Sequence, residues 1–471
     1  MILFKKQLDW LDKIKEINKK ECENCGQKLA YIETFGCILN ENDSEKIAGM
    51  LEQAGYSVTI DENLRSAADL VIFNTCCIRE NAEEKLFGRL GEVKKQAIEK
   101  GSIIILCGCM MQQKHILEKI KKSYPFVDYI FGTHTIYNFP ENLYNVIKNR
   151  KRVIDIEEES DIFEGMPTRH TKDKFAIVPI IYGCNNFCSY CIVPYVRGRE
   201  KSRDPEEILS EVKKLANDGY TEIMLVGQNV NSYKGKGAID NFAKLLDEVA
   251  MIPGISKIRF ISPHPKDFTE DVAKVIAKHK NISRNLHYPL QSGSDKVLKE
   301  MNRKYTKAQY LERAENIRKY VPDVTFSTDI IVGFPGETEE DFKETLDVVR
   351  KMRFEQIFMF IYSKRKGTMA EKMENQVPEE IAHERFNRLQ ETYEEILDDI
   401  NNEYIGKIES IIIDEETSSG KDDKNTKDSL KGRLDSNKIV VIPKYDGFKI
   451  GEKIEVEILE NRKWYLKGRK V

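Results

Sequence analysis

A run of three cysteines in the middle of the chain carries the strongest chemical signal. Cys184, Cys188 and Cys191 are spaced as C-x3-C-x2-C. Three thiolates at this spacing can hold three irons of a [4Fe–4S] cluster, which leaves the fourth iron without a protein ligand. An open iron can chelate a small molecule, as catalysis requires. The alternatives are a zinc knuckle that lacks its fourth ligand and a chance cluster of cysteines. No nearby histidine completes a zinc ligand set.

A second set of cysteines is dispersed along the N-terminal region. Cys37, Cys76 and Cys109 each follow a different predicted strand. The carboxyl ends of parallel strands share one edge of a sheet, so the three thiols could converge in the crevice where such folds bind ligands. The alternative is that cysteine is simply a common small buried residue, which is how we interpret Cys77 and Cys107.

Two weaker signals are a further cysteine pair and several glycine turns. Cys22 and Cys25 have ligand spacing but no second pair to complete a site, and we interpret them as an incidental or weakly metal-binding pair. Glycines at strand ends let the backbone approach a bound cofactor closely. These turns include Gly227 with Gln228, and Gly333 with Gly336.

Basic residues gather at two places. Arg197, Arg199, Lys201 and Arg203 follow the cysteine motif. The C-terminus combines cations with aromatics, a composition that suits phosphate contact and base stacking. The candidates there are Arg462, Lys463, Trp464, Lys467, Arg469 and Lys470. A solvated terminal strand is the alternative for this tail.

The chain has the length and composition of a globular protein with several domains. It has 471 residues, of which 40% are hydrophobic and 32% charged. Its 75 Lys and Arg against 78 Asp and Glu give a net charge of −3, which excludes a generally basic protein that coats nucleic acid. No apolar run approaches the ~18 residues of a membrane span, and the N-terminus lacks the pattern of a secretion signal. We therefore expect a cytoplasmic protein whose ten cysteines stay reduced and serve metal or redox chemistry.

The secondary-structure elements that must position these residues fall into regions with different sequence patterns. Residues 1–28 are an extension with a predicted surface helix carrying Leu8, Leu11 and Ile14. Residues 29–150 alternate apolar strands with helices, which predicts an open parallel α/β sheet. The predicted strands are 30–35, 69–74, 103–107 and 129–131, and the helices are 43–54, 83–100, 112–122 and 136–148.

A charged linker at 151–174 leads to a second alternating region, 175–402. Its six strand–helix units predict a partial or full β/α barrel, whose chemistry lies at the carboxyl ends of the strands. The predicted strands are 177–182, 222–226, 257–262, 285–290, 324–332 and 356–362. Residues 403–471 hold short β runs between turns, which predicts a small all-β barrel with a mobile loop at 418–429.

Over residues 29–471 the chain resembles the radical S-adenosylmethionine methylthiotransferases. The cysteine motif, with Tyr190 before its last cysteine, is similar to theirs, and so is the order of an N-terminal three-cysteine domain, a radical core and a C-terminal TRAM module. Three stretches are similar to the branch that makes 2-methylthio-N6-(dimethylallyl)adenosine in tRNA. They are Asn74–Glu80, Ser262–Phe268 and Gly432–Lys438. Cys77 departs from the family, because relatives often carry serine there.

The resemblance implies a mechanism and its cofactors. Cys184, Cys188 and Cys191 would hold the cluster that binds and cleaves S-adenosylmethionine, giving a radical that removes hydrogen from C2 of the modified adenine beside the anticodon. Cys37, Cys76 and Cys109 would hold an auxiliary [4Fe–4S] cluster that carries or donates the sulfur. C2–H carries no acidic proton, so we assign no acid or base. The residues expected to line the S-adenosylmethionine pocket are Gly227, Gln228, Gln291, Gly333 and Gly336.

The implied partners are the tRNA anticodon stem-loop and an electron donor such as a flavodoxin or a ferredoxin, with no membrane involved. Close relatives act instead on threonylcarbamoyladenosine in tRNA or on an aspartate of a ribosomal protein, and both remain alternatives. A more distant alternative is an iron–sulfur protein that binds RNA without catalysis. A purely structural cluster has no need for an open iron, which favours the enzyme.

Overall fold

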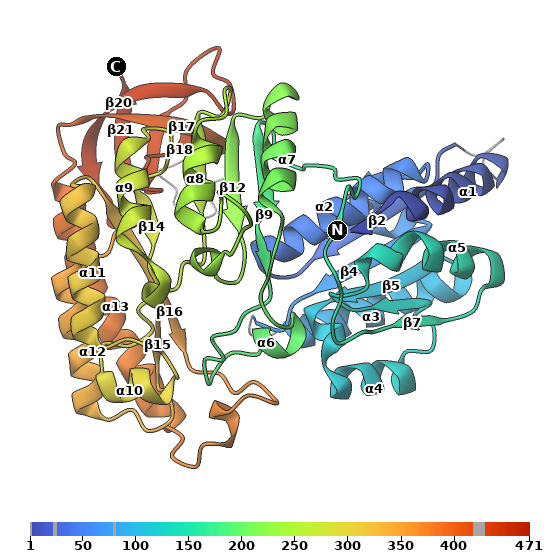
Figure 1. The fold of residues 1–471 in the computed structure, drawn as a ribbon, viewed down its shortest axis with the longest axis horizontal. Coiled ribbons are helices and arrows are strands. Elements are labelled where there is room, and N and C mark those ends of the chain that lie inside the picture. Colours follow the sequence, from blue (N-terminus) through green and yellow to red (C-terminus); the bar gives the residue numbers. More distant parts are fainter. Residues whose placement is uncertain (1, 22–25, 79–81, 418–428) are drawn as a thin grey trace. The chain divides into compact units, whose positions relative to one another are not determined.

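The computed structural model describes residues 2–21, 26–78, 82–417 and 429–471. The chain divides into two compact units, which are described one at a time. The first comprises residues 1–187 and 191–228, and the second comprises residues 188–190 and 229–471 (Figure 1). Cys22, Cys25 and nearly all of the loop predicted at 418–429 lie outside the described residues.

A six-stranded parallel sheet organises the first unit. Its spatial order is β3-β2-β4-β5-β6-β7. The strands are β2 (Leu29–Thr34), β3 (Ser57–Thr59), β4 (Leu70–Thr75), β5 (Ile103–Gly108), β6 (Tyr129–Phe131) and β7 (Val153–Asp155). Strands β4 and β5 are buried along their whole length, as expected for central strands covered on both faces.

Helices cover both faces of this sheet. One core forms against α1 (Lys5–Glu21), α2 (Ile38–Gln53) and α5 (Phe139–Asn149). The other forms against α3 (Ala82–Glu99) and α4 (Lys114–Ser123).

The N-terminal helix α1 is part of this packing. Leu11 and Ile14 are fully buried, and the Trp10 ring lies 4.9 Å from that of Tyr144 on α5. The apolar stripe that predicted a surface helix therefore belongs to the core of the first unit.

The remainder of the first unit carries the segment around the cysteine motif. Strand β9 (Phe175–Pro179) pairs in parallel with β12 (Glu222–Val226). Beyond β9, the short antiparallel pair β10 (Ile181–Tyr182) and β11 (Lys201–Ser202) encloses the motif and α6 (Val193–Val196). Helix α7 (Pro205–Asn217) follows β11. Near the N-terminus, the two-residue strand β1 (Ile2–Leu3) pairs in parallel with β8 (Phe163–Glu164).

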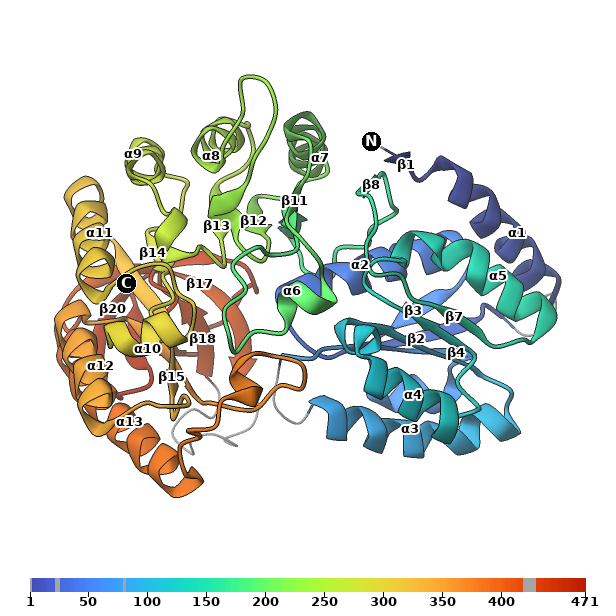
Figure 2. The ribbon, with the colours of Figure 1, turned by 60° about the horizontal axis from the view of Figure 1, so that its bottom comes forward.

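Parallel strands also organise the second unit. Strand β15 (Thr325–Val332) lies between β14 (Asn285–His287) and β16 (Gln356–Ile361). Strand β13 (Lys257–Phe260) precedes them. The helices lie along the outer side of the strands (Figure 2). They are α8 (Phe242–Ala250), α9 (Glu270–Lys278), α11 (Lys307–Tyr320), α12 (Glu339–Met352) and α13 (Glu379–Asn402), while the short α10 (Asp295–Glu300) follows β14.

A closed five-stranded barrel ends the second unit, in the order β17-β18-β19-β21-β20. The strands are β17 (Ile408–Thr417), β18 (Ser429–Arg433), β19 (Ile439–Pro443), β20 (Lys453–Asn461) and β21 (Leu466–Lys470). The barrel is fixed to the rest of the unit by a buried ion pair, in which Lys438 Nζ lies 3.1 Å from Glu355 Oε1.

The predicted fold class is confirmed in its three parts: the N-terminal parallel sheet, the central strand–helix region and the small C-terminal barrel. Strands β3, β7 and β18 were not predicted, and β3 and β7 are three residues each. The domain boundaries expected from the sequence stay predictions. In the described ranges, no helix combines the length and the apolar character that crossing a bilayer requires.

Candidate metal centres

The three dispersed cysteines lie at the carboxyl ends of three neighbouring strands. Cys37 caps the start of α2 after β2, Cys76 follows β4, and Cys109 follows β5. These strands are adjacent in the sheet, so the three turns share one edge, as the sequence predicted.

Asn40, which the sequence analysis did not identify, ties the three turns together. Its Oδ1 atom lies 4.0 Å from Cys37 Sγ and 3.7 Å from Cys109 Sγ. Its Nδ2 atom donates to the carbonyl of Thr75, next to Cys76, at 2.8 Å. The side chain is fully buried, so one amide contacts all three cysteine-bearing turns.

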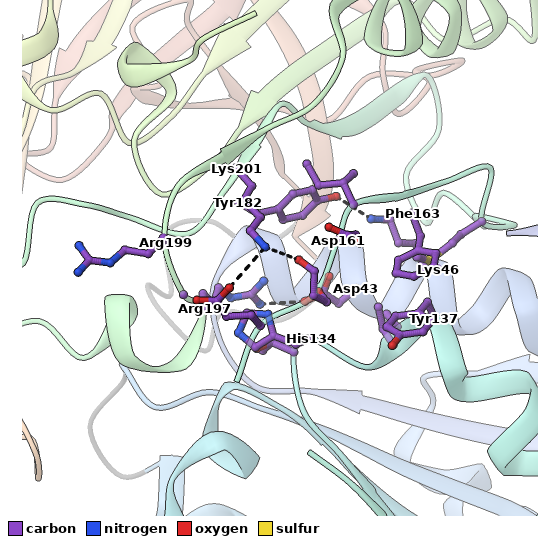
Figure 3. A pocket seen from close by; sticks show the side chains of 17 residues that line it. Asp43, Lys46, His134, Tyr137, Asp161, Phe163, Tyr182, Arg197, Arg199 and Lys201 are labelled. Atoms are coloured by element: carbon purple, nitrogen blue, oxygen red, sulfur yellow. Dashed lines mark hydrogen bonds and ion pairs between the residues drawn. The ribbon is translucent and has the colours of Figure 1, made fainter. Parts of the chain in front are cut away.

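Arg197 supplies positive charge to the same place. Its Nε atom donates to Cys109 Sγ at 3.2 Å, and its Nη2 atom donates to Asn40 Oδ1 at 2.7 Å and to Asp43 Oδ2 at 2.8 Å. Figure 3 shows Arg197 and Asp43 together on the wall of a pocket that Lys46 and Tyr182 also line. A guanidinium with 7% of its surface exposed stabilises thiolate at this edge, because hydrogen bonds to an ionised acceptor are strong.

The cysteines of this edge differ in their pKa values. The hydrogen bond with Cys77 and the charge of Arg197 lower the pKa of Cys109. Burial raises the pKa of Cys37 and of Cys107. Cys77 is thus a hydrogen-bonding neighbour of Cys109, and its interpretation as a weak ligand candidate stays a prediction.

Two glycines allow the close approach of these turns. Gly36 has a φ of +132°, and a Cβ there would lie 2.6 Å from Cys76 Cβ. Gly108 has a φ of +93°, and a Cβ there would lie 2.4 Å from Asn74 Oδ1. A glycine directly before Cys37 and before Cys109 is visible in the sequence and indicates a tight turn, but we did not use it in the sequence-based prediction.

The donor set at this edge fits a [4Fe–4S] cluster. It offers three thiols from separate turns and a buried cation that offsets thiolate charge. Among the described residues, no three His, Cys, Asp or Glu side chains converge as ligands of a single metal ion. A cluster differs from such a site, because each thiolate binds its own iron.

The contiguous motif begins in a tight turn of the first unit. Gly183 has a φ of +73°, and a Cβ there would lie 2.1 Å from the carbonyl oxygen of Arg199. The Cys184 amide donates to the carbonyl of Gly198 at 3.1 Å, and the Arg199 guanidinium lies 4.3 Å from the centre of the Phe187 ring. Cys191 belongs to the same unit, two residues before the start of α6.

Cys188 is held in the second unit together with Ser189 and Tyr190. Arg303 Nη1 donates to Cys188 Sγ at 3.7 Å, and the guanidinium is also held by the Pro289 carbonyl at 2.9 Å. Ser189 anchors the segment, because its amide donates to the Met301 carbonyl at 3.1 Å. Arg303 is 7% exposed, so this cysteine also has a buried cation beside its sulfur.

The residues predicted to line the S-adenosylmethionine pocket fall into two groups. Gly227 and Gln228 follow β12 in the first unit, and Gln228 Oε1 is buried without a partner among the described atoms. Gln291, Gly333 and Gly336 belong to the second unit, where Gln291 extends the pairing of β14 with β15.

The glycine turn after β15 is closed by the protein itself. The Gly333 amide donates to Glu337 Oε2 at 2.8 Å, and the Gly336 amide donates to the Asn375 carbonyl at 2.8 Å. Burial raises the pKa of Glu337 to about 7. Both amide N–H groups are therefore engaged within the protein, and the place of Gly333 and Gly336 in the S-adenosylmethionine pocket stays a prediction.

Most of the predicted basic candidates are engaged within the protein. Arg203 is buried and forms a bidentate pair with Glu164 at 2.8 and 2.6 Å. At the C-terminus, Lys463 pairs with Glu394 of α13, and the Trp464 ring lies 6.2 Å from that of Tyr393.

Other residues of the tail also have partners. Arg462 pairs with Glu460 at 2.6 Å, Arg469 pairs with Glu457 at 2.7 Å, and Lys470 lies 3.9 Å from the centre of the Tyr445 ring. Lys467 lies on β21. All six predicted residues of the tail remain candidates for RNA contact, and Lys463 and Trp464 also contact α13.

Three family profiles match the chain. The Radical SAM superfamily matches residues 178–349, the uncharacterized protein family UPF0004 matches residues 29–132, and the TRAM domain matches residues 402–471. Among solved structures, the radical S-adenosylmethionine methyltransferase TsrM from Kitasatospora setae, with cobalamin and a [4Fe–4S] cluster bound, has a TM-score of 0.52 at 14% identity. It covers 74% of this chain and 77% of its own, and this likeness concerns the fold alone. Fold and cysteine motif together define a radical SAM protein with a TRAM domain.

Curated relatives match over nearly the whole length. The tRNA-2-methylthio-N(6)-dimethylallyladenosine synthase of Clostridium botulinum (strain Alaska E43 / Type E3) is 48% identical over 467 residues, 98% of this chain and 99% of the relative. Those of Acetivibrio thermocellus and Caldicellulosiruptor saccharolyticus are each 47% identical, over 98% and 99% of this chain and 95% and 97% of their own lengths. The chain therefore belongs to the family of tRNA-2-methylthio-N(6)-dimethylallyladenosine synthases, and the resemblance inferred from the sequence is confirmed.

Proposed function

We propose that this protein methylthiolates C2 of N6-(dimethylallyl)adenosine beside the anticodon of tRNA. The observation that carries the proposal is the match at 48% identity over 98% of the chain to a synthase named for this product. The structure supports it with thiols in two separate settings and a buried arginine beside a sulfur in each.

Each set of cysteines has its own task in this proposal. Cys184, Cys188 and Cys191 would hold the cluster at which S-adenosylmethionine binds, and Cys37, Cys76 and Cys109 would hold an auxiliary cluster. When bound, these groups supply a 5′-deoxyadenosyl radical and the sulfur, while the protein supplies positions and electrostatics. Arg303 and Arg197 offset the negative charge of thiolates at the two sites.

The partners follow from the substrate. The anticodon loop is single-stranded, so its bases can be unstacked at lower cost than those of a duplex. The C-terminal barrel would contact the tRNA backbone, and a flavodoxin or a ferredoxin would deliver the electron. Because tRNA is the substrate, we place the reaction in the cytoplasm.

The decisive experiment is a defined reaction. Full-length protein with reconstituted clusters is incubated anaerobically with S-adenosylmethionine, a reductant, a sulfide source and an anticodon stem-loop RNA. The RNA carries dimethylallyladenosine, threonylcarbamoyladenosine or plain adenosine, and nucleosides are analysed by mass spectrometry. We expect methylthiolation of the first RNA only, and none with the Cys184→Ala variant. Product from the second RNA alone would assign the chain to the other tRNA activity.

The role of the barrel is tested by salt dependence. Replacing Arg462, Lys467, Arg469 and Lys470 with alanine leaves the anchoring residues in place. Each lost phosphate contact should flatten the slope of log affinity against log salt by about 0.7 to 0.9. Replacing the exposed Lys94 and Lys95 of α3 with alanine provides a control that should leave the slope unchanged. An unchanged slope would move the RNA contacts away from this tail.

A further inference from the structure

Strand β16 of the second unit leaves two aromatic side chains open on one face. The Phe358 side chain is 41% exposed and that of Phe360 is 50% exposed. Ile357, which directly precedes Phe358 in the strand, is only 6% exposed. Alternate residues of a strand point to opposite faces. The face of Ile357 packs against α13, whose Tyr393 hydroxyl donates to the Glu355 carbonyl at 3.0 Å. The face of the two phenylalanines is therefore the inner face, away from the helix.

A polar pair lies beside the first of these rings. In the parallel register, Phe358 is opposite Asp329 of β15. His287 of β14 lies with its Nε2 atom 3.3 Å from Asp329 Oδ2 and its ring 5.9 Å from that of Phe358. The other ring nitrogen of His287 lies 3.1 Å from Ser327 Oγ, which fixes the imidazole. The inner face thus combines aromatic surface with groups that can accept and donate hydrogen bonds.

The aromatic face continues toward the cysteine motif. Tyr362 directly follows the end of β16, and its amide still donates to the Val332 carbonyl at 2.9 Å. The alternation of the strand therefore continues and places Tyr362 on the same face as Phe360. The Tyr362 hydroxyl is buried and has no hydrogen-bond partner among the described residues. Its ring lies 5.5 Å from that of Phe334, in an apolar cluster that also includes Ile331 and Tyr190. Ile331 is the register partner of Phe360, and Tyr190 follows Cys188 by two residues.

We propose that Phe358 and Phe360, with His287 and Asp329 beside them, bind the prenylated adenine whose C2 is modified. This assignment rests on the proposed function and adds the residues that recognise its substrate. Alternate residues of a strand are about 6.6 Å apart. That is close to twice the ~3.4 Å step between stacked bases, which leaves room for one planar base between two rings.

The chemistry of the face matches this ligand in three respects. Aromatic side chains stack on any base, and an extruded base is typically held by stacking together with hydrogen bonds to its edge. The N6–H group of the modified adenine can donate to the Asp329 carboxylate. The dimethylallyl group is apolar, so it gains from contact with exposed aromatic surface that water would otherwise cover.

Binding measurements test the assignment directly. Affinity for an anticodon stem-loop RNA is measured by fluorescence anisotropy, with and without the dimethylallyl group, for wild type, Phe358→Ala, Phe360→Ala and Phe360→Leu. We expect the wild type to prefer the prenylated RNA. Each alanine variant should bind that RNA about 5- to 100-fold more weakly, and much of the preference should vanish. Phe360→Leu should keep part of the preference, because leucine retains apolar bulk but cannot stack.

The control is Tyr320→Ala, an aromatic of similar exposure (38%) near the end of α11. It should leave both affinities unchanged. Variants that keep the wild-type preference for prenylated RNA would overturn the assignment. The proposed function is tested independently by the defined reaction. It would be contradicted if the wild type made no methylthiolated product from the prenylated RNA.

A second measurement covers the case in which an alanine variant does not fold. A photoreactive purine replaces the target base in RNA bound to the wild-type protein, and the crosslinked peptide is sequenced after irradiation. Crosslinks within residues 356–362 support the assignment. Crosslinks confined to other segments overturn it.

Discussion

The two thiol sites are built by opposite strategies. Cys184, Cys188 and Cys191 come from one loop of eight residues, whereas the auxiliary cysteines come from three turns that only the completed sheet brings to one edge. Both strategies nevertheless place a buried arginine beside a sulfur. Iron–sulfur potentials depend on hydrogen bonds to the sulfurs and on nearby charge, so each arginine can adjust its own site.

The arginines differ in their other partners. Arg197 shares its charge with the Asp43 carboxylate at 2.8 Å, whereas Arg303 bonds to the Pro289 carbonyl and the Tyr305 hydroxyl, which are neutral. The carboxylate cancels part of the field of Arg197. We therefore expect a stronger net positive field at Cys188 than at Cys109.

The largest effect should come from removing the contiguous site. Replacing Cys184, Cys188 and Cys191 with alanine should abolish cleavage of S-adenosylmethionine and all methylthiolation. Iron should fall from about eight to about four per chain, because each cluster holds four irons. Iron analysis and detection of 5′-deoxyadenosine check both expectations. Complete loss of iron in a folded variant would mean that the two sites are not independent.

Removing the dispersed site should have a narrower effect. With Cys37, Cys76 and Cys109 replaced by alanine, iron should again fall to about four. Cleavage of S-adenosylmethionine should continue while methylthiolated product disappears, because the radical site lies in another part of the chain. Circular dichroism serves as the folding control. Loss of cleavage in a folded variant would contradict the division of labour.

The arginines should show smaller effects, each confined to its own site. Arg197→Met should weaken iron binding of the auxiliary site about 10- to 100-fold and shift its reduction potential downward, because groups behind the ligands tune affinity and potential. Arg303→Met should weaken iron binding and lower the reduction potential at the contiguous site, and its shift in potential should be the larger of the two. Each variant is titrated by EPR in the background that lacks the other set of cysteines. A shift at the wrong site would refute the pairing of arginine and cluster.

Cys77 should show the smallest effect. Cys77→Ala removes the hydrogen bond to Cys109 but no ligand, so iron content should stay at the wild-type value. The pKa of Cys109 in metal-free protein should rise toward its ordinary value. A loss of about four irons would make Cys77 a ligand after all.

The fold was largely predictable because central strands such as β4 and β5 are continuous apolar runs and most of the helices are long. The edge strands β3 and β7 were missed because each has only three residues and includes polar ones, whereas the equally short β6 was found because it is wholly apolar. The cysteines themselves could be found because thiols combine rarity with specific chemistry.

The surroundings of the cysteines could not be predicted. Arg197 and Cys109 are 88 residues apart, and Arg303 and Cys188 are 115 apart, so no local pattern connects them. Basic residues after the motif suggested RNA, yet the structure buries Arg197 and Arg203. Phe358 and Phe360 lie in a continuous apolar run, and alternation cannot reveal an exposed face there.

The contacts of Asn40 with the three cysteine-bearing turns have a consequence for the order of folding and metal binding. Its hydrogen bonds join the three cysteine turns through protein atoms alone. A small zinc finger must wait for its metal before it can fold, because only the metal holds its ligands together. At this edge the Asn40 amide joins the turns through protein atoms, so we expect their arrangement to depend less on the metal than that of a zinc finger does.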